Sequence, residues 1–385
     1  MKLNVLFIAG DEFPPMPGGT GTVVYYAAVN LRADSIAVLS NVRNALPSSK
    51  YSHRYSPIFG ERNKILQSFS AVRLAAWAKF SFSPTIIVAG SLWCSNVGLY
   101  LKKVLRVPML LYAHGTEILR LGTYRWDKPL LALQAADAIL PNSSYTGKLL
   151  LERGIDPARI EVINHAADPA IFYPLPSEEI DRIRQHHGLE SKRILLTVAN
   201  LQMHKGHDVV IRALPAIRER IPDVVYCIVG RGREEGSLRA LARNLGVAGQ
   251  VRFFTDINNR GRLREFYNLC DVFIMASRMI PERSDVEGFG IAFIEANACG
   301  KAVIGGRSGG VPDAVVDGVT GMLVTPEDVD DIARTVVRLL GDSQLARRLG
   351  EQGRERVIKE LNWENRAERL HEVCERVIMR KRDGV

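Results

Sequence analysis

VFIMASRMIPERSDVEGFGIAFIEANACGKAVI, residues 272–304, contains two short apolar runs separated by a helical segment. The runs at 272–275 and 302–304 predict buried strands, and residues 290–298 predict a helix that follows a Gly-rich entry. The apolar positions in these strands are continuous rather than alternating, which indicates burial on both faces. A strand, a helix and a second strand in this order predict one β-α-β unit of a parallel sheet.

The same alternation runs through both halves of the chain. In the first half, strands are expected at residues 4–9, 36–39, 85–89, 109–112, 138–140 and 159–163, and helices near 20–32, 64–80, 96–105 and 128–136. In the second half, strands are expected at 194–198, 224–229, 251–254, 272–275, 302–304 and 321–324, and helices at 206–220, 234–245, 261–268, 290–298 and 329–340. This pattern predicts an α/β protein with two doubly wound, Rossmann-like parallel sheets.

The length of 385 residues also favours two domains. Residues 164–176 carry Asp168-Pro169 and Pro174-Leu175-Pro176, and prolines disfavour helix, so this segment is expected to be a linker. We expect a first domain at 1–168, a second at 169–362, and a C-terminal helix within 363–385 that packs back on the first domain. Two such domains facing a cleft would bind ligands at the carboxyl ends of their strands.

The composition, 46% hydrophobic and 24% charged, is that of an ordinary globular protein. The five cysteines are scattered and lack C-x-x-C spacing, which argues against a disulfide framework and a zinc site and favours buried thiols. The N-terminal apolar run is too short for a secretory signal, and no run approaches the ~18–20 residues of a membrane span. We therefore expect a cytoplasmic protein.

The formal charge of +9 favours anionic partners such as phosphates, nucleic acid or an acidic membrane. No block of like charge or basic-aromatic tract indicates nucleic acid in particular, so none is expected as a partner.

Two glutamates, Glu287 and Glu295, lie eight residues apart across the Gly-rich entry into the helix at 290–298. Free N–H groups at a helix start favour an anion, and eight helical residues span roughly 12 Å. This separation suits one carboxylate on a sugar ring and the other on the ribose of the same nucleotide sugar. The alternative is a solvated helix with a capping glutamate.

These two glutamates, followed by Ala298-Cys299-Gly300-Lys301 and Gly309-Gly310-Val311-Pro312, closely resemble the family-4 retaining glycosyltransferases of GT-B fold. The resemblance covers nearly the whole chain and is most marked from Thr197 to Pro326. It implies that Glu295 holds the ribose hydroxyls and that Glu287 contacts the donor sugar. It also implies that Phe289 and Gly290 present backbone amides to the sugar or the phosphate.

Lys205 ends the segment Leu201-Gln202-Met203-His204-Lys205 and precedes Gly206, after the first strand of the second half. An ammonium group there would stabilise the leaving nucleotide diphosphate. The family commonly carries an arginine five residues earlier, where this chain has Asn200 at the donor site. Arg231 and Arg283 are the candidates to replace that arginine. The alternative for Lys205 is a surface lysine that starts a helix.

Two glycine turns follow strands. Pro17-Gly18-Gly19-Thr20-Gly21 resembles the family's N-terminal glycine loop, in which Gly18 and Gly19 approach the donor phosphate. Gly230-Arg231-Gly232 resembles a second turn near the nucleotide. Glu235 occupies the place of the third glycine of a dinucleotide fingerprint, which disfavours a hydride-transfer dehydrogenase.

His114 follows the strand at 109–112 and resembles the family histidine that borders the donor sugar and the reaction centre. A lone histidine is otherwise often structural. Glu117 is expected either to bind the acceptor or to begin a helix.

No metal ion is expected, and no cofactor besides the nucleotide-diphosphate sugar that serves as donor. Asp328-Val329-Asp330 is the obvious Asp-x-Asp, but it lies at a predicted helix start, where acidic residues stabilise the helix dipole.

The stretch 62–80 combines basic and apolar residues: Arg62, Lys64, Arg73 and Lys79 with Ile65, Leu66, Phe69, Val72, Leu74, Ala76, Trp77 and Phe80. Such a helix either lies on an anionic membrane or packs on its own sheet. In the first case the protein would work at the inner face of the membrane on a lipid or lipid-linked acceptor.

We therefore expect a metal-independent, retaining glycosyltransferase that moves a hexose-type sugar from a nucleotide-diphosphate sugar to a glycan, a lipid-linked sugar or a small molecule. Its transfer would proceed by front-side attack, with His114, Glu287 and Lys205 as the catalytic residues. The alternatives are a GT-B-like nucleotide-sugar epimerase and a non-catalytic nucleotide-sugar binding protein. The sequence leaves the base, the sugar, the acceptor and the oligomeric state open.

Overall fold

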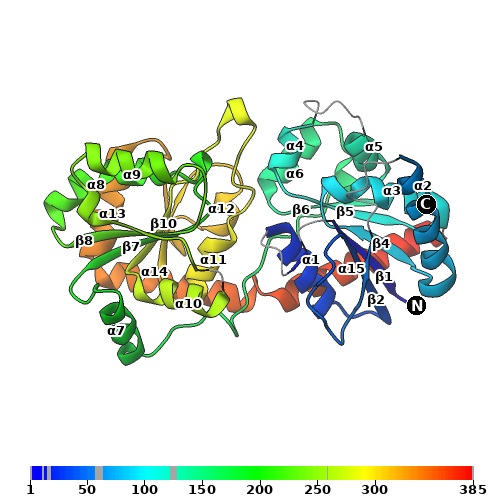
Figure 1. Cartoon of the computed structure of the whole chain (residues 1–385), viewed down its shortest axis with the longest axis horizontal. Coiled ribbons are helices and arrows are strands. Elements are labelled where there is room, and N and C mark those ends of the chain that lie inside the picture. Colours follow the sequence, from blue (N-terminus) through cyan, green and yellow to red (C-terminus); the bar gives the residue numbers. More distant parts are fainter. Residues whose placement is uncertain are drawn as a thin grey trace. The chain divides into compact units, whose positions relative to one another are not determined.

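The computed structural model of the chain describes residues 2–10, 13–14, 19–56, 64–121, 128–257 and 259–383. The chain forms two compact units, one of Met1–His165 with Trp363–Val385 and the other of Ala166–Asn362. Each unit has a six-stranded parallel sheet with helices on both faces (Figure 1). The predicted α/β fold with two Rossmann-like sheets is confirmed.

The sheet of the first unit has the strand order β3-β2-β1-β4-β5-β6. Its strands are β1 (Asn4–Gly10), β2 (Ser35–Ser40), β3 (Ser52–Tyr55), β4 (Ile86–Ala89), β5 (Met109–Ala113) and β6 (Ala138–Pro141). Its helices are α1 (Gly19–Asn30), α2 (Lys64–Trp77), α3 (Ser95–Leu105), α4 (Thr116–Leu119), α5 (Lys128–Ala135), α6 (Ser144–Glu152) and α15 (Trp363–Arg382), with short helical turns η2 (Ala78–Phe82), η3 (Leu92–Cys94) and η4 (Pro157–Arg159).

The sheet of the second unit has the order β12-β11-β10-β7-β8-β9. Its strands are β7 (Arg193–Val198), β8 (Val224–Val229), β9 (Val251–Phe254), β10 (Val272–Met275), β11 (Ala302–Gly306) and β12 (Gly321–Val324). Its helices are α7 (Ser177–His186), α8 (His207–Arg220), α9 (Glu235–Asn244), α10 (Arg260–Leu269), α11 (Ile291–Ala298), α12 (Val311–Ala314), α13 (Val329–Gly341) and α14 (Ser343–Lys359), with turns η5 (Met203–Lys205), η6 (Ala248–Gln250) and η7 (Pro281–Arg283).

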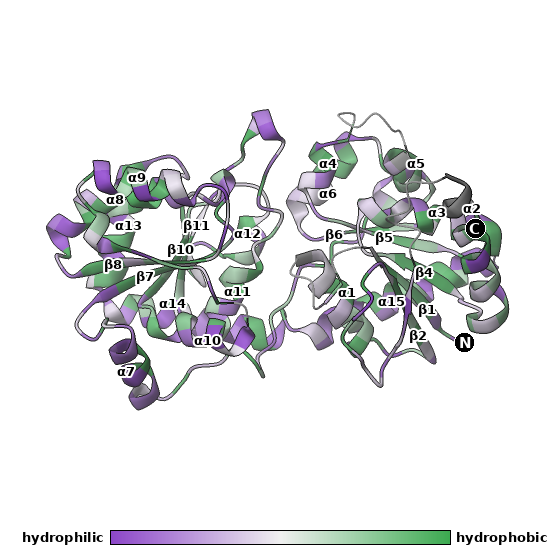
Figure 2. Cartoon of the chain, in the orientation of Figure 1, coloured by the Kyte–Doolittle hydropathy of each residue, from purple (hydrophilic) through white to green (hydrophobic). Residues whose placement is uncertain are grey.

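Strand side chains of the second unit alternate between two hydrophobic cores. On β8, Cys227 packs with α10 and α11 on one face of the sheet, whereas Tyr226 and Ile228 pack with α8 and α13 on the other. Because successive strand residues point to opposite faces, a continuous apolar strand fills both cores. The strands are accordingly coloured as hydrophobic, while α7, which adds little to either core, is largely hydrophilic (Figure 2).

One predicted strand of the first unit is wrong, and one observed strand was not predicted. Residues 159–163 were expected to form a strand, but Ile160 makes only an isolated bridge with Ile139. The sixth strand is β3 instead, which pairs with β2 and carries mostly polar side chains. Hydrophobic periodicity could not reveal β3, because an edge strand needs little burial.

The C-terminal helix α15 belongs to the first unit. The Trp363 ring stacks on Tyr26, with ring centroids 4.5 Å apart. Arg366 is buried and donates hydrogen bonds to the Tyr112 hydroxyl and to the Asn164 carbonyl oxygen, each over 3.1 Å. These contacts complete the core of a unit whose other residues all lie before residue 166 of the chain.

All five cysteines are free and buried, as the sequence predicts. Within the described parts of the chain, no helix combines the length and the apolar character that crossing a bilayer requires.

Candidate active site

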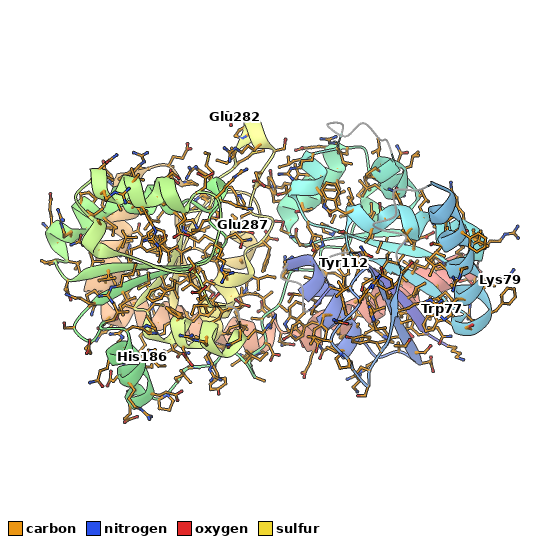
Figure 3. The ribbon with its side chains drawn as sticks, in the orientation of Figure 1. Trp77, Lys79, Tyr112, His186, Glu282 and Glu287 are labelled. Atoms are coloured by element: carbon orange, nitrogen blue, oxygen red, sulfur yellow. The ribbon has the colours of Figure 1, made fainter. Side chains whose placement is uncertain are left out.

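Lys205 and Glu287 form a buried ion pair in the second unit. Lys205 ends the turn after β7, and Glu287 lies on the loop after the neighbouring strand β10, so both follow carboxyl ends of adjacent parallel strands. The Lys205 Nζ atom is 2.5 Å from Glu287 Oε2, and the side chains are only 18% and 11% exposed. Burial raises the pKa of Glu287, but Lys205, His204 and the Phe289 N–H together lower it below its ordinary value. Glu287 is therefore ionised at neutral pH. Its position in the second unit is labelled in Figure 3.

Further contacts join the Lys205 loop to the loop that carries Glu287. The Arg278 N–H donates to the His204 carbonyl oxygen over 2.9 Å, and His204 Nδ1 lies 3.3 Å from Asp285 Oδ2. The Glu287 carbonyl oxygen in turn accepts a hydrogen bond from the Gly310 N–H at 2.9 Å. The position of the ion pair is thus fixed by the backbone as well as by its own side chains.

Two glycines allow these loops to approach so closely. At Gly206, which has φ +75°, a Cβ atom would lie 2.0 Å from the Ala276 carbonyl oxygen. At Gly230, with φ +150°, a Cβ would lie 2.0 Å from the Ala199 carbonyl oxygen. Both positions therefore require glycine for backbone packing, whatever ligand the loops bind. Close backbone packing is therefore a structural reason for glycine at position 230, in addition to the predicted role of Gly230 near the nucleotide.

Helix α11 begins beside Glu287 and carries Glu295. Gly290, with φ +96°, precedes its first residue, and the Phe289 side chain is buried in the core. Glu295 Oε2 accepts a hydrogen bond from the Tyr267 hydroxyl over 2.8 Å. Burial raises the pKa of Glu295, against the opposing effects of Arg260 and Tyr267. The pKa values of the two glutamates are therefore shifted in opposite directions. The carboxylate of Glu287 is paired with a cation, whereas that of Glu295 accepts a hydrogen bond from a hydroxyl group.

Asn200 is exposed, and its carbonyl oxygen is 3.3 Å from His207 Nε2. Neither candidate replacement for the missing arginine contacts the Lys205–Glu287 pair. Arg231 donates to Asp256 Oδ1 over 2.7 Å, and Arg283 Nη1 lies 3.7 Å from Glu234 Oε1. Exposed ion pairs of this kind contribute only ~0–1 kcal/mol, so a phosphate could displace either carboxylate.

In the first unit, His114 follows β5. Its Nε2 lies 2.8 Å from the Gly90 carbonyl oxygen, which can only accept, so Nε2 carries the proton and Nδ1 is an acceptor. The ring stacks on His165, with centroids 5.6 Å apart. Burial lowers the pKa of His114 to about 4, and the charge of Arg366 adds to this effect against the Gly90 hydrogen bond. His114 is therefore a neutral imidazole at physiological pH.

Glu117 is buried, and both of its carboxylate oxygens accept backbone N–H groups. Oε1 accepts from His114 over 3.0 Å, and Oε2 accepts from Leu92 over 2.9 Å. This carboxylate ties the loop after β4 to the loop after β5. The geometry favours a positioning role for Glu117, while acceptor binding by this residue stays a prediction.

The predicted N-terminal glycine loop is only partly described. Gly18 lies outside the described residues, and Gly19 is the first residue of α1. The structure thus gives His114, Glu117 and Gly19 to the first unit, and the second unit contains Lys205, Glu287, Phe289, Gly290, Glu295, Asn200 and Gly230. It brings Lys205 and Glu287 into contact, while Glu295 lies on α11.

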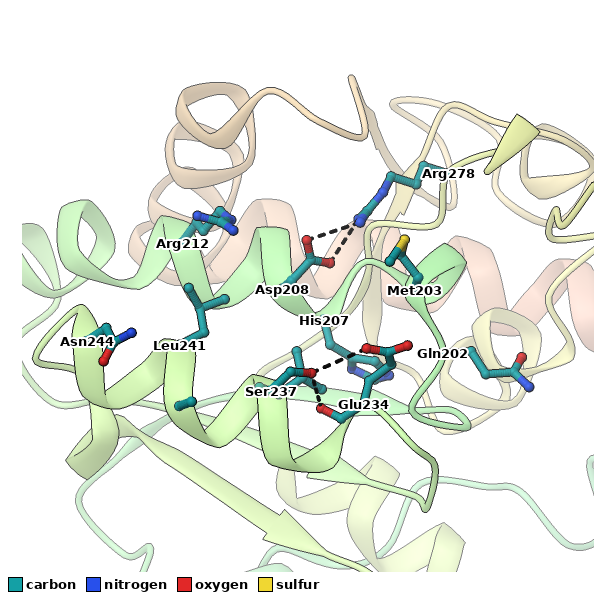
Figure 4. Close-up of a pocket in the computed structure, with 12 residues that line it drawn as sticks. Gln202, Met203, His207, Asp208, Arg212, Glu234, Ser237, Leu241, Asn244 and Arg278 are labelled. Atoms are coloured by element: carbon teal, nitrogen blue, oxygen red, sulfur yellow. Dashed lines mark hydrogen bonds and ion pairs between the residues drawn. The ribbon is translucent and has the colours of Figure 1, made fainter. Parts of the chain in front are cut away.

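A cavity of about 380 Å³ lies between α8, α9 and the loop at 202–208 (Figure 4). Arg278 points into it but is engaged by both carboxylate oxygens of Asp208, at 2.9 and 3.0 Å. None of the predicted site residues lines this cavity. Arg278 is thus already neutralised, while the other arginine of the lining, Arg212, belongs to α8. Because the predicted site residues lie elsewhere, the cavity is a poor candidate for the donor site.

Sequence reasoning missed three groups that hold the site. His204 and Asp285 flank the predicted residues closely and could have been found by their spacing from Lys205 and Glu287. Tyr267 lies on α10 and gave no signal in the sequence, because its role depends on how α10 packs against α11.

Asp328 is the N-cap of α13, and its side chain accepts a hydrogen bond from the Asp331 N–H, as the capping interpretation predicts. Among the described residues, no group of three or more His, Cys, Asp or Glu could hold a metal ion.

Comparison with known proteins agrees with this architecture. Residues 17–171 match the family described as Glycosyltransferase Family 4, and residues 179–356 match the family described as Glycosyl transferases group 1. Among solved structures, HepE of Anabaena in complex with UDP superposes with a TM-score of 0.81 at 20% identity, covering 98% of this chain and all of the other. Sucrose-phosphate synthase of Thermosynechococcus elongatus gives 0.78 at 21% identity, covering 98% and 100%. At such identities these similarities show the fold.

Closer relatives are known by sequence. A GDP-mannose-dependent monoacylated alpha-(1-6)-phosphatidylinositol monomannoside mannosyltransferase of Corynebacterium glutamicum is 33% identical over 387 residues, covering 96% of this chain and 97% of the relative. A GDP-mannose-dependent alpha-(1-6)-phosphatidylinositol monomannoside mannosyltransferase of Mycolicibacterium smegmatis is 37% identical over 238 residues, which span 62% of each protein. The chain therefore belongs to the glycosyltransferases of Family 4, with the GT-B fold.

Proposed function

We propose that the chain is a retaining glycosyltransferase that uses a nucleotide-diphosphate sugar without a metal ion. The observation that carries this proposal is the buried Lys205–Glu287 pair beside α11, which also carries Glu295. A cation, a sugar-binding carboxylate and a ribose-binding carboxylate at one edge of a parallel sheet suit a nucleotide sugar.

In the proposed mechanism, Lys205 turns from Glu287 to the donor diphosphate and stabilises the charge that develops on the leaving group. Glu287 then accepts hydrogen bonds from the donor sugar, and Glu295 accepts them from the ribose. No carboxylate in these motifs has the spacing of a nucleophile, so transfer with retention would proceed by front-side attack. Neutral His114, with Nδ1 as an acceptor, would receive a hydrogen bond from a sugar hydroxyl.

For the donor we propose GDP-mannose. The support is that the relatives at 33% and 37% identity are named as GDP-mannose-dependent mannosyltransferases. The same names specify phosphatidylinositol mannosides, which supports a lipid-linked acceptor. Such an acceptor would place this protein at a membrane surface, on the cytoplasmic side, through contacts of α2.

The test is an assay of sugar transfer and nucleotide binding with purified protein. Thermal shifts with GDP, UDP, ADP and dTDP, each with and without EDTA, report the base and the need for a metal, because a ligand of the native state raises its stability. We expect a shift with GDP that survives EDTA and transfer of mannose to a phosphatidylinositol mannoside.

Glu287→Gln should abolish most of the transfer, whereas Glu282→Gln, an exposed glutamate on the same loop, should leave it unchanged. NMR of the donor incubated alone separates the alternatives, since an epimerase would convert the sugar without any acceptor. The proposal fails if no nucleotide binds, or if both variants transfer sugar as well as the wild type.

A further inference from the structure

The first unit buries a positive charge that no described carboxylate neutralises. Arg366, on α15, is only 4% exposed. Its Nε donates to the Asn164 carbonyl oxygen and its Nη1 to the Tyr112 hydroxyl. Its Nη2 is buried and has no hydrogen-bond partner among the described residues. Burying a cation without a counter-ion costs free energy, and a buried polar group without a partner calls for an explanation in terms of function.

Two aromatic rings replace part of the missing counter-ion. The Arg366 Cζ atom lies 4.9 Å from the centroid of the Tyr112 ring and 5.6 Å from that of Trp363. A guanidinium at such distances is attracted by the negative face of a ring. Tyr112, labelled in Figure 3, therefore meets Arg366 both through its hydroxyl group and through its ring.

Tyr112 begins a row of stacked rings that leads to the candidate active site. The ring centroids of Tyr112 and His114 are 6.2 Å apart and their planes differ by 24°. Those of His114 and His165 are 5.6 Å apart, with planes 28° apart. At the far end of the row, Asn142 Nδ2 lies 3.3 Å from His165 Nε2. The row is thus held by Arg366 at one end and by Asn142 at the other, with His114 between them.

The His114 ring has one nitrogen fixed and one left over. The Gly90 carbonyl oxygen occupies Nε2, and Glu117 accepts only the backbone N–H of His114. Titratable or charged groups reach His114 from four other parts of the unit: Tyr112 of β5, Glu117 of α4, His165 at the end of the first segment, and Arg366 of α15.

The charge of Arg366 acts against a proton on either histidine of the row. Burial is the main cause that lowers the pKa of His114, and Arg366 lowers it further. The pKa of His165 is lowered by burial first, and then by His114 and Arg366. An imidazole that binds a second proton carries N–H on both nitrogens and no longer accepts a hydrogen bond. A buried cation beside the row therefore preserves the acceptor at Nδ1 of His114.

We propose that Arg366 is a positioning residue for sugar transfer, which holds the row of Tyr112, His114 and His165 so that His114 offers Nδ1 to a sugar hydroxyl. The inference deepens the proposed function and rests on it, since it takes His114 to border the donor sugar. In this proposal Arg366 touches no substrate and acts through the rings that it holds.

The first test is Arg366→Met, which removes the charge and both hydrogen bonds. We expect kcat to fall roughly 10- to 100-fold, because a small displacement of an active-site group is enough for such a loss. The acid limb of the kcat/KM profile should move to higher pH, because the pKa of His114 rises without the cation. The thermal shift with GDP should persist, since the proposed nucleotide site belongs to the second unit.

Two further arginine variants separate positioning from general destabilisation. Arg366→Lys keeps the charge but replaces the planar fork by a compact ammonium group. It should retain the wild-type pH profile and recover part of kcat. The control is Arg369→Gln on the same helix, whose side chain is 48% exposed and pairs with Glu161 and Glu372. It should leave both kcat and the pH profile unchanged.

Tyr112→Phe serves where Arg366→Met does not fold. It removes the hydroxyl acceptor of Arg366 and keeps the ring of the stacked row. The expected loss in kcat is smaller, roughly 3- to 10-fold, as for one hydrogen bond.

NMR of ¹⁵N-histidine reports on the row without any activity. His114, assigned with the variant His114→Gln, should show a protonated Nε2 and a bare Nδ1 from pH 5.5 to 8 in the wild type and in Arg366→Lys. In Arg366→Met its titration should move to higher pH. A wild type that transfers no sugar removes the proposed function, and this titration alone then decides whether Arg366 controls His114.

The proposal is overturned if Arg366→Met keeps the kcat of the wild type. It is also overturned if this variant loses activity but keeps the wild-type pH profile and the wild-type titration of His114, because a merely structural arginine predicts that result.

Discussion

At the residue scale, the 2.5 Å contact between Lys205 and Glu287 couples stability to function. Lys205→Met should lower kcat/KM by roughly 100- to 1,000-fold, because it removes a cation from the leaving group. It should also destabilise the fold by about 3 kcal/mol, because Glu287 is left buried without its partner. In the double variant Lys205→Met/Glu287→Gln, urea unfolding should show most of the lost stability restored, while activity stays low. Loss of activity without any change in stability would contradict the buried pair.

The pKa of Glu287 lies below its ordinary value, which sets the sign of its pH dependence. Its contribution to stability is fully present above the unfolded pKa of about 4.3 and is lost as the pH falls through the lower, folded pKa. The contribution of Glu295 to stability has the opposite pH dependence, because its pKa is raised. Its ionised form therefore lowers the free energy of unfolding at neutral pH.

Glu295→Gln should therefore raise the free energy of unfolding at pH 7 and at the same time weaken nucleotide binding by about 10- to 100-fold, since the ribose hydroxyls lose an ionised acceptor. The measurement is urea unfolding at pH 7 and pH 4 together with titration of GDP. The stabilising effect should shrink at pH 4. A variant that is less stable at pH 7 and binds GDP normally would contradict both assignments.

His114 gives a third prediction, from its pKa of about 4. Neutral His114 should produce no ionisation between pH 5.5 and 8 in the profile of kcat/KM, where an ordinary histidine would titrate near 6.5. Because the folded pKa is depressed, His114 opposes folding increasingly as the pH falls below 6.5. His114→Gln should accordingly lose less stability than the wild type between pH 7 and pH 5. An activity limb near 6.5 that disappears in this variant would show that the imidazole titrates normally.

At the scale of elements, the loop after β7 depends on backbone packing that no other residue type allows. Gly206→Ala would place a Cβ 2.0 Å from the Ala276 carbonyl oxygen at a positive φ, so it should destabilise the protein by more than about 2 kcal/mol and lower kcat/KM by displacing Lys205. Gly236→Ala in α9 meets nothing within 4 Å and should stabilise by about 0.5–1 kcal/mol. Urea unfolding of the two variants tests this contrast, and similar effects would argue against the close packing.

The elements also show what can be read from a sequence. β8 and β10 were predicted at their observed bounds, because their apolar side chains fill two cores and leave a continuous hydrophobic run. β3 was missed, because an edge strand with the sequence SHRY carries no such run. Helices α7 and α14 were missed as well, although Pro176 before α7 and Asp342, the N-cap of α14, are start signals that could have indicated them.

The sequence indicated part of the candidate site for a similar reason, while the ligand-binding roles of its residues stay predictions. Lys205, Glu287 and Glu295 lie in short motifs, and the spacing of these motifs can be read directly from the sequence. The support from Tyr267 to Glu295 depends on the packing of α10 against α11 and could not be predicted. The same holds for Arg366, which reaches Tyr112 from a position 254 residues later in the chain.

At the scale of the whole molecule, α15 is part of the first unit, and Trp363 is its anchor. Trp363→Ala should destabilise the first unit by about 3–5 kcal/mol, because the ring is buried and stacks on Tyr26. Met379→Ala on the same helix is half exposed and should have little effect. Hydrogen exchange followed by mass spectrometry resolves the two units. The interpretation requires that amides of the first unit lose protection while those of the second keep it.

The position of α15 in the sequence has a consequence for biosynthesis. Residues 1–165 leave the ribosome first, but the helix that covers Tyr26 and Tyr112 is translated only after residues 166–362. At ~5–20 residues per second, the nascent N-terminal segment waits roughly 10–40 s with this apolar surface exposed. The second unit needs no later segment and is complete when Asn362 emerges. The unit that is synthesised first thus completes its core only after the rest of the chain has been translated, and during that interval its apolar surface is accessible to chaperones.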